Sequence, residues 1–153
     1  MVTIFIKKNG DFFIELLPDG KTFNTEYFNQ VIIPQIFSLA FPDGKVKYKK
    51  RALLHFDNAT SHKEHHVMET LNENHFKLIL NPPYSLDISP LDFGVFGTIK
   101  EMLQSEMSES EDELKERIHE ILTNLGKGFI TNVFSTWERR LQQVIDTNGL
   151  YIK

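Results

Sequence analysis

The chain has 153 residues, of which 41% are hydrophobic and 12% aromatic, so it is long enough to bury a core of its own. It contains no cysteine, which excludes disulfide bonds and thiolate metal sites, and no apolar run of about 18 residues that could span a membrane. The formal net charge is −4, whereas autonomous DNA-binding domains are usually basic. The composition therefore argues against strong DNA binding by this chain alone.

Two short β-rich segments, residues 2–7 and 12–17, begin the chain and are joined by Asn9-Gly10, a dipeptide typical of tight hairpin turns. They predict an antiparallel hairpin. Asn24 is a helix-capping residue, and apolar residues at helical spacing predict a helix from there to about residue 41. Pro34 lies inside this segment and is expected to kink or split the helix, because proline lacks an amide hydrogen.

An apolar run at residues 51–56 predicts a buried central strand, which ends just before an aspartate. Ser61 and Glu64 have the spacing of a capping box, so a helix is expected from there to about residue 74. Residues 76–80 are again short and apolar, and they predict a second strand that two prolines terminate. A strand, a helix and a strand in this order favour a parallel pair with a crossover helix.

The rest of the chain is predicted to be helical. Ser89 precedes Pro90, a residue type favoured at the first helical position, and a helix is expected from there to about residue 104. Ser110 and Glu113 form a second capping box before another amphipathic helix, and a final helix is expected to follow it. Three glycines are expected to break or end these helices: Gly126, Gly128 and Gly149.

Asp57 follows the predicted central strand, and Asp92 lies at the start of the predicted helix. Two carboxylates in such places can hold divalent metal ions, and a pair of ions about 4 Å apart is a common device for in-line attack on a phosphodiester. Carboxylate oxygens suit Mg²⁺ or Mn²⁺ rather than zinc. Other interpretations remain, because Asp92 also suits helix capping, Asp57 also suits an ordinary turn, and Asp87 is expected to form a turn.

Two segments around these aspartates resemble the catalytic core of mariner-type transposases, members of the DDE/DDD recombinase group. Residues 57–62 read Asp-Asn-Ala-Thr-Ser-His, and residues 82–92 read Pro-Pro-Tyr-Ser-Leu-Asp-Ile-Ser-Pro-Leu-Asp. The 34 residues between the two aspartates (58–91) match the spacing of the last two catalytic aspartates in mariner elements. Leu86 replaces a proline that is usual in the family. Weaker similarity is found in three further places: residues 15–18, Trp137 and residues 148–152.

The resemblance implies an α/β, ribonuclease-H-like fold, in which a mixed sheet is flanked by helices. It implies that residues 1–153 form a single, partial catalytic domain, which lacks the opening central strand and the helix-turn-helix DNA-binding domains of the family. The first catalytic aspartate of the family lies on that opening strand. Asp11 and Asp19 are poor substitutes for it, because both lie in predicted turns.

The lack of a central strand leaves two strand edges without a partner, at residues 1–7 and 51–56. These edges can pair with one another in an antiparallel ladder, which we expect for a soluble monomer because internal pairing has no association cost. The alternative is a gap in the sheet, which leaves buried backbone groups unpaired at about one to a few kcal/mol each. A gap would favour pairing with a strand from another molecule.

The resemblance implies that Asp57 and Asp92 are catalytic ligands for Mg²⁺ or Mn²⁺, which bind weakly without the third carboxylate, and that Asn58 and His62 support them. It implies a function in DNA cleavage and strand transfer during cut-and-paste transposition, in the nucleus. The implied partners are transposon terminal repeats and a second copy or an intact transposase. The alternative function is an inactive, decayed or domesticated fragment that serves as a DNA- or protein-binding scaffold.

Two further groups of residues have competing interpretations. One is a basic segment that either contacts DNA phosphates or forms a solvated loop: Lys45, Lys47, Lys49, Lys50 and Arg51. The other is a histidine cluster, in which His62 and His66 have helical spacing but no His-Glu-x-x-His motif, so zinc is not favoured. His65 and His66 are expected at the surface, and Trp137 is expected to pack in the core.

Overall fold

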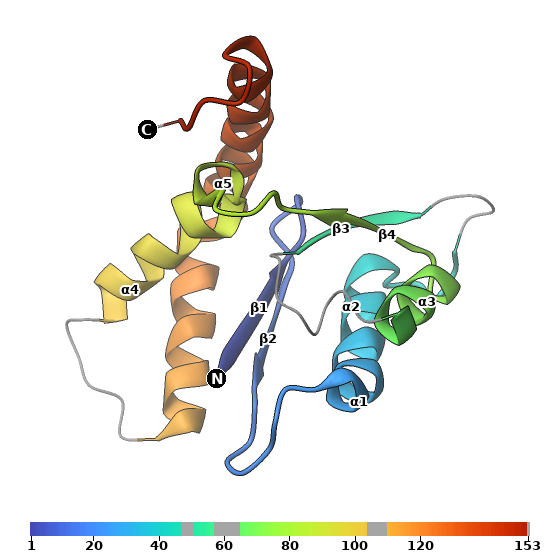
Figure 1. Ribbon diagram of the computed structural model, residues 1–153. Coiled ribbons are helices and arrows are strands. Elements are labelled where there is room, and N and C mark those ends of the chain that lie inside the picture. The colour runs from blue at the N-terminus through green and yellow to red at the C-terminus, as the bar shows by residue number, and fades with distance from the viewer. Residues whose placement is uncertain (47–50, 57–64, 104–109, 153) are drawn as a thin grey trace. The chain divides into compact units, whose positions relative to one another are not determined.

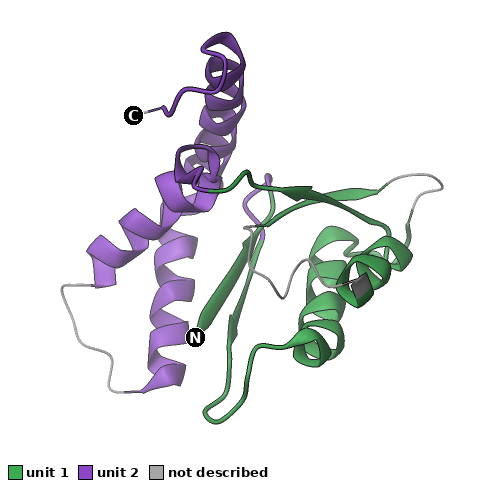
Figure 2. Ribbon diagram, viewed as in Figure 1, with its two compact units in different colours: residues 1–7, 12–83 green, residues 8–11, 84–153 purple. Residues whose placement is uncertain are grey.

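The computed structural model describes residues 1–46, 51–56, 65–103 and 110–152. Strands and helices mix along the chain, as the predicted α/β class requires (Figure 1). The chain divides into two compact units: unit 1 is residues 1–7 and 12–83, and unit 2 is residues 8–11 and 84–153 (Figure 2). Across the described ranges, all the strands belong to unit 1, and no helix is both long and apolar enough to cross a membrane.

The first two strands form the predicted antiparallel hairpin. β1 (Val2–Ile6) pairs with β2 (Phe12–Leu16) along their full lengths. In the connecting turn, Oδ1 of Asn9 accepts the amide hydrogen of Asp11 at 3.1 Å, and Gly10 adopts a positive φ of 91°. Residues with a Cβ rarely adopt this conformation, which explains the Asn-Gly pair at this point of the sequence.

The helix predicted from residue 24 is present but divided. Asn24 caps α1 (Thr25–Tyr27), because its Oδ1 accepts a backbone amide hydrogen at 2.9 Å. A π-helical segment, η1 (Phe28–Ile32), follows, and α2 (Ile33–Ala40) continues from it. Pro34, in the first turn of α2, has no amide hydrogen to donate, and the wider π turn directly before it accommodates that loss. Pro34 is predicted to kink or split the helix, whereas the observed change is from α to π geometry and back, with helical backbone throughout.

A parallel strand pair comes next. β3 (Ala52–Phe56) pairs with β4 (Phe76–Leu80), and α3 (His65–Glu73) lies between them in the sequence. This is the predicted strand–helix–strand crossover, and both strands match their predicted bounds within one residue. The capping box predicted at Ser61 and Glu64 lies outside the described residues.

The core of unit 1 connects the helices to both strand pairs. The ring of Phe56, at the end of β3, lies edge-on to Phe28 of η1 with 5.6 Å between ring centroids, and edge-on to Phe5 of β1 at 5.8 Å. Helices α2 and α3 lie on one face of the β3–β4 pair and contribute to the same cluster (Figure 1). The buried residues of this core are Phe5, Phe28, Ile32, Ile33, Ile36, Phe56, Val67, Leu71 and Phe76.

The described strands form two separate two-stranded sheets, β1–β2 and β3–β4. No backbone ladder joins β1 to β3 among the described residues. The expectation that these two strands pair in an antiparallel ladder is therefore wrong, and the alternative, a gap in the sheet, is observed. The physical reason is that the two strands meet through aromatic side chains, Phe5 and Phe56, rather than through backbone hydrogen bonds.

Unit 2 contains one long helix, α5 (Glu111–Asp146). Its predicted cap is confirmed, because the Ser110 side chain accepts the amide hydrogen of Glu113 at 3.2 Å. The helix is broken at Gly126 as predicted, since a φ of 73° and a ψ of 170° are not helical. Gly128, which is predicted to break the helix together with Gly126, stays within it. Glycine permits a break but does not require one.

The segment of unit 2 before α5 begins with a single 3₁₀ turn, η3 (Leu86–Ile88). A helix then begins at Pro90, the predicted first position. It contains a π-helical segment, η4 (Asp92–Phe96), and continues as α4 (Gly97–Leu103). The last residue predicted for this helix, residue 104, lies outside the described residues.

The gap between the two sheets predicts that an added strand stabilises the chain. A peptide that copies the opening strand of mariner-type catalytic domains should raise the melting temperature of residues 1–153 as its concentration increases. A ligand that binds only the folded state stabilises it by mass action, by about 2.7 kcal/mol at one hundred times its dissociation constant. Thermal melting followed by circular dichroism measures this shift.

The same peptide with a central proline is the matched control, because proline lacks the amide hydrogen that a strand ladder needs. A melting temperature that excess peptide leaves unmoved would show that the gap needs no partner strand.

Candidate functional site

The carboxyl ends of β3 and β4 lie at the same edge of the parallel pair. The amide of Asn81 donates to the carbonyl of Phe56 at 3.0 Å, so the ladder extends one residue past β4 and reaches the last residue of β3. Asp57 follows Phe56 in the sequence, and residues 82–92 follow Asn81. Both segments that carry the resemblance therefore follow strand ends at one edge, which is where open parallel sheets bind ligands.

Asp92 lies in the first turn of the helix that begins at Pro90. Its amide and that of Phe93 both donate to the carbonyl of Ser89, each at 3.1 Å. The residues from Asp87 to Pro90 are buried, whereas the Asp92 side chain is exposed. Within the described residues, no hydrogen bond or ion pair occupies its carboxylate. An acid here also interacts favourably with the helix dipole, so capping and ligand binding are compatible roles.

The 3₁₀ turn before Asp92 is hydrogen-bonded to distant parts of unit 2. The indole nitrogen of Trp137 donates to the carbonyl of Ile88 at 2.7 Å, and Nη1 of Arg140 donates to the carbonyl of Asp87 at 2.9 Å. Asp87 is 5% exposed, and its Oδ2 accepts the amide hydrogen of Ile152 at 2.8 Å. Asp87 forms the predicted turn but is also a buried acceptor. Trp137 is half-buried and is a donor as well as a packing residue.

The end of the chain reaches this turn because the backbone changes direction after α5. Asn148 and Gly149 have positive φ values of 53° and 91°, and the amide of Gly149 donates to the carbonyl of Val144 at 2.8 Å. This left-handed pair ends the helix, as predicted for Gly149. The backbone beyond it places the amide of Ile152 beside the Asp87 carboxylate.

The helix that carries Asp92 also packs closely on α5. The guanidinium of Arg140 lies over the ring of Phe93, 4.5 Å from its centroid. A Cβ on Gly94 would lie 2.8 Å from Cγ1 of Val133, so only glycine permits this approach without a shift. Residues 133–140 of α5 therefore contact the chain both before and after Asp92.

Comparison with known proteins establishes the family. A family model described as DDE superfamily endonuclease matches residues 21–148. The chain belongs to this superfamily. It is 25% identical over 157 residues to the Mariner Mos1 transposase of Drosophila mauritiana, with 100% of this chain and 45% of that protein covered. It is also 26% identical over 151 residues to the Histone-lysine N-methyltransferase SETMAR of Homo sapiens, with 99% and 22% covered. The chain thus spans less than half the length of these two relatives.

Several solved structures have the same fold as this chain. The catalytic domain of Mos1 mariner transposase gives a TM-score of 0.86 at 22% identity, and the match covers 99% of this chain and 75% of that chain. The Mos1 mariner paired end complex with Mn gives a TM-score of 0.85 at 22% identity, with 99% and 44% covered. The mariner-type resemblance and the ribonuclease-H-like α/β fold predicted from the sequence are confirmed.

Of the two predicted catalytic carboxylates, the structure describes only that of Asp92. Asp57 and the predicted supporting residues Asn58 and His62 lie outside the described residues. The proximity of Asp57 to Asp92 therefore stays a prediction.

The histidines of α3 show no metal site in the part of the chain that the structure describes. His66 is exposed, and its Nδ1 lies 3.7 Å from Oε2 of Glu69. Its predicted surface position is confirmed. Among the described residues, no group of three or more His, Cys, Asp or Glu side chains could hold a metal ion.

The predicted basic segment is described only at its ends. Lys45 and Arg51 are exposed. The other three residues lie outside the described ranges: Lys47, Lys49 and Lys50. Arg51 precedes β3, whereas Asp57 follows it, and a strand of this length spans about 16 Å.

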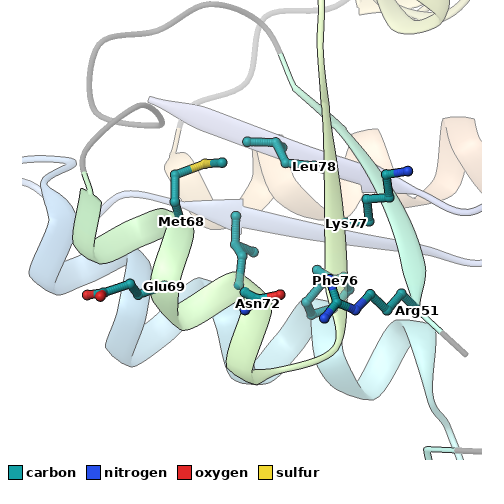
Figure 3. A pocket seen from close by; sticks show the side chains of 8 residues that line it. Arg51, Met68, Glu69, Asn72, Phe76, Lys77 and Leu78 are labelled. Carbon is teal, nitrogen blue, oxygen red and sulfur yellow. The ribbon is translucent and has the colours of Figure 1, made fainter. Parts of the chain in front are cut away.

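Arg51 also lines a pocket of about 400 Å³ beside α3 and β4 (Figure 3). Its lining combines apolar side chains, such as Met68 and Phe76, with the charged side chains of Glu69 and Lys77. Because Phe76 begins β4, this pocket lies away from the carboxyl edge where β4 ends.

The hydrogen bond from Arg140 and the second role of Asp87 were not predicted from the sequence. These residues are 53 positions apart, and no local pattern pairs them. The available signal was the spacing of Trp137 and Arg140, because residues three apart lie on the same face of a helix.

The close packing of η4 on α5 predicts opposite effects for two glycines of one helix. Gly94→Ala forces a methyl group against Val133, which is buried and β-branched, so we expect a loss of about 1–3 kcal/mol of folding free energy. Gly97→Ala meets no atom within 4 Å and should stabilise the helix by about 0.5–1 kcal/mol. Urea unfolding measures both, and equal stabilities would contradict the close approach.

Proposed function

We propose that this chain contributes part of the catalytic core of a mariner-type DNA transposase, and that the complete core acts in metal-dependent DNA cleavage and strand transfer. The observation that carries the proposal is the family match over residues 21–148. It is supported by the exposed carboxylate of Asp92 and by the common edge of β3 and β4, after which both resemblance segments follow.

The available donor atoms suit Mg²⁺ or Mn²⁺. Asp92 presents an exposed carboxylate, and Asp57 would supply a second one after the end of β3. Carboxylate oxygens are the ligands that these ions prefer. Similar solved structures include the Mos1 transposase catalytic domain and Raltegravir with Mn and with Mg. When bound, such ions activate the attacking hydroxyl and stabilise negative charge on the phosphate oxygens.

The chain's own residues would hold and orient this centre. Asp57 and Asp92 bind the ions, and Asn58 and His62 support the carboxylates. The backbone amides of the helix start carry a partial positive charge, which attracts an acidic side chain at this position. Lys45 and Arg51 would contact DNA phosphates.

We infer the partners from the relatives. The similar solved structures include a Mos1 transposase paired-end complex with left transposon end and a Mos1 Strand Transfer Complex. For this chain we propose transposon terminal repeats as the DNA partner and a second transposase copy as the protein partner. The net charge of −4 fits a core whose DNA affinity comes largely from elsewhere. We propose a nuclear location, because the reaction acts on chromosomal DNA.

Metal binding distinguishes a ligand role for Asp92 from simple helix capping. Asp92→Asn should abolish the broadening that Mn²⁺ causes in the amide NMR signals of Asp92 and Phe93, because the carboxylate is lost. Asp112→Asn is the matched control, since Asp112 is also an exposed acid in a first helical turn. Each substitution should cost about 0.3–1 kcal/mol of stability through the helix dipole. Equal Mn²⁺ broadening in all three proteins would contradict the ligand role.

Residues 1–153 by themselves should show no strand transfer. Only two of the three carboxylates that the resemblance assigns to the site are found in this sequence, and both oxygens of an in-line displacement rely on the metal pair. A gel assay with labelled mariner-type terminal repeats and Mg²⁺ tests this, with an intact mariner transposase as the positive control. Specific, Mg²⁺-dependent nicking by residues 1–153 would contradict the expectation.

A further inference from the structure

We propose that Trp137, Arg140 and Ile152 position the Asp92 carboxylate for metal binding by fixing the turn that precedes it. These three donors, with the acceptors on Asp87 and Ile88, are called the clamp below. The inference rests on the proposed function, because it takes Asp92 as a metal ligand. It adds positioning residues that lie 49 to 65 positions from their acceptors.

The direction of the Asp92 side chain depends on its backbone. Among the described residues, Asp92 has no hydrogen-bond or ion-pair partner for its carboxylate. Its backbone, by contrast, is fixed within the first helical turn by the bond from its amide to Ser89. Ser89 directly follows Ile88, whose carbonyl accepts the Trp137 indole hydrogen. The clamp is therefore connected to Asp92 through a single short, buried segment of backbone.

Arg140 contacts the chain on both sides of Asp92. Its Nη1 donates to the carbonyl of Asp87, five residues before Asp92, and its guanidinium lies over the ring of Phe93, the next residue. One side chain of α5 thus relates the turn to the helix start. Metal ligands must be held within about 0.5 Å of a productive geometry, which requires such supporting contacts.

The hydrogen bonds of the clamp are directional, and their loss has a local cost. Asp87 and Ile88 are buried, at 5% and 6% exposure. A buried acceptor that loses its donor is destabilising, so the turn would rearrange to find another partner. Such a rearrangement changes where the helix starts. The clamp also explains why similarity to mariner transposases extends to Trp137 and residues 148–152, since these segments meet residues 82–92 at this turn.

Three variants test the side-chain donors. Trp137→Phe keeps an aromatic ring but removes the indole donor, and Arg140→Met keeps an apolar stem but removes the guanidinium. Arg139→Met is the matched control, because Arg139 is the exposed neighbour of Arg140 on α5.

Two variants of Asp87 test the hydrogen bond from the Ile152 amide to the Asp87 carboxylate. Asp87→Asn keeps an oxygen acceptor for the amide of Ile152, whereas Asp87→Ala removes it. This pair keeps the proposal testable if Trp137→Phe or Arg140→Met does not fold. If Asp87→Asn behaves like the wild type and Asp87→Ala does not, the effect comes from the lost hydrogen bond and not from any substitution at this position.

The measurements use residues 1–153 below the melting temperature of the least stable variant. Mn²⁺ titration, followed by broadening of the Asp92 and Phe93 amide signals, gives the metal affinity. Hydrogen exchange of the same amides without metal gives the order of the helix start. Trp137→Phe, Arg140→Met and Asp87→Ala should weaken Mn²⁺ binding about tenfold and speed this exchange, whereas Asp87→Asn and Arg139→Met should match the wild type.

Exchange rates and Mn²⁺ affinities within about twofold of the Arg139→Met control would overturn the proposal. An equal loss in Asp87→Asn and Asp87→Ala would also overturn it, since the acceptor would then be irrelevant. If the wild type shows no Mn²⁺ broadening that Asp92→Asn removes, the proposed function fails instead. Hydrogen exchange still decides the clamp in that case: faster exchange in the clamp variants supports it, and unchanged exchange overturns it.

Discussion

The ring of Phe56 lies edge-on to that of Phe28, 5.6 Å away, and this contact connects β3 to the η1 segment. Unit 1 depends on such contacts because its described strands form two sheets of two strands each. A two-stranded sheet is marginally stable in water unless it packs against other elements. Burial of a large apolar side chain contributes about 1.5–3 kcal/mol to the free energy of folding. The aromatic core therefore provides stability that, in a continuous sheet, would come partly from backbone hydrogen bonds.

The same core has a consequence for the candidate site. Phe56 is the last residue of β3 and also accepts the amide hydrogen of Asn81. Packing of its side chain and pairing of its backbone therefore fix the strand end that immediately precedes Asp57. The apolar core of unit 1 determines where the first motif begins, even though that motif itself lies outside the described residues.

In unit 2, the turn before Asp92 is held by hydrogen bonds rather than by apolar packing alone. Around Asp87 and Ile88, polar donors from α5 and from the chain end satisfy buried acceptors, and close packing of Gly94 on Val133 reinforces the same orientation. Hydrophobic contacts alone are non-directional, whereas hydrogen bonds prescribe angles as well as distances. This difference suits a helix start whose exposed carboxylate is proposed to bind metal.

The sequence by itself determined the local elements and the family. The Asn9-Gly10 turn, the cap at Ser110 and the apolar runs of β3 and β4 act over a few residues, and all were predicted correctly. The spacing of Asp57 and Asp92 identified the mariner resemblance. Only the tertiary structure decided that β1 and β3 stay unpaired and that Trp137 and Arg140 bind the turn before Asp92. Those outcomes depend on contacts between residues about 50 positions apart or more, which no short-range pattern of polarity or turn residues encodes.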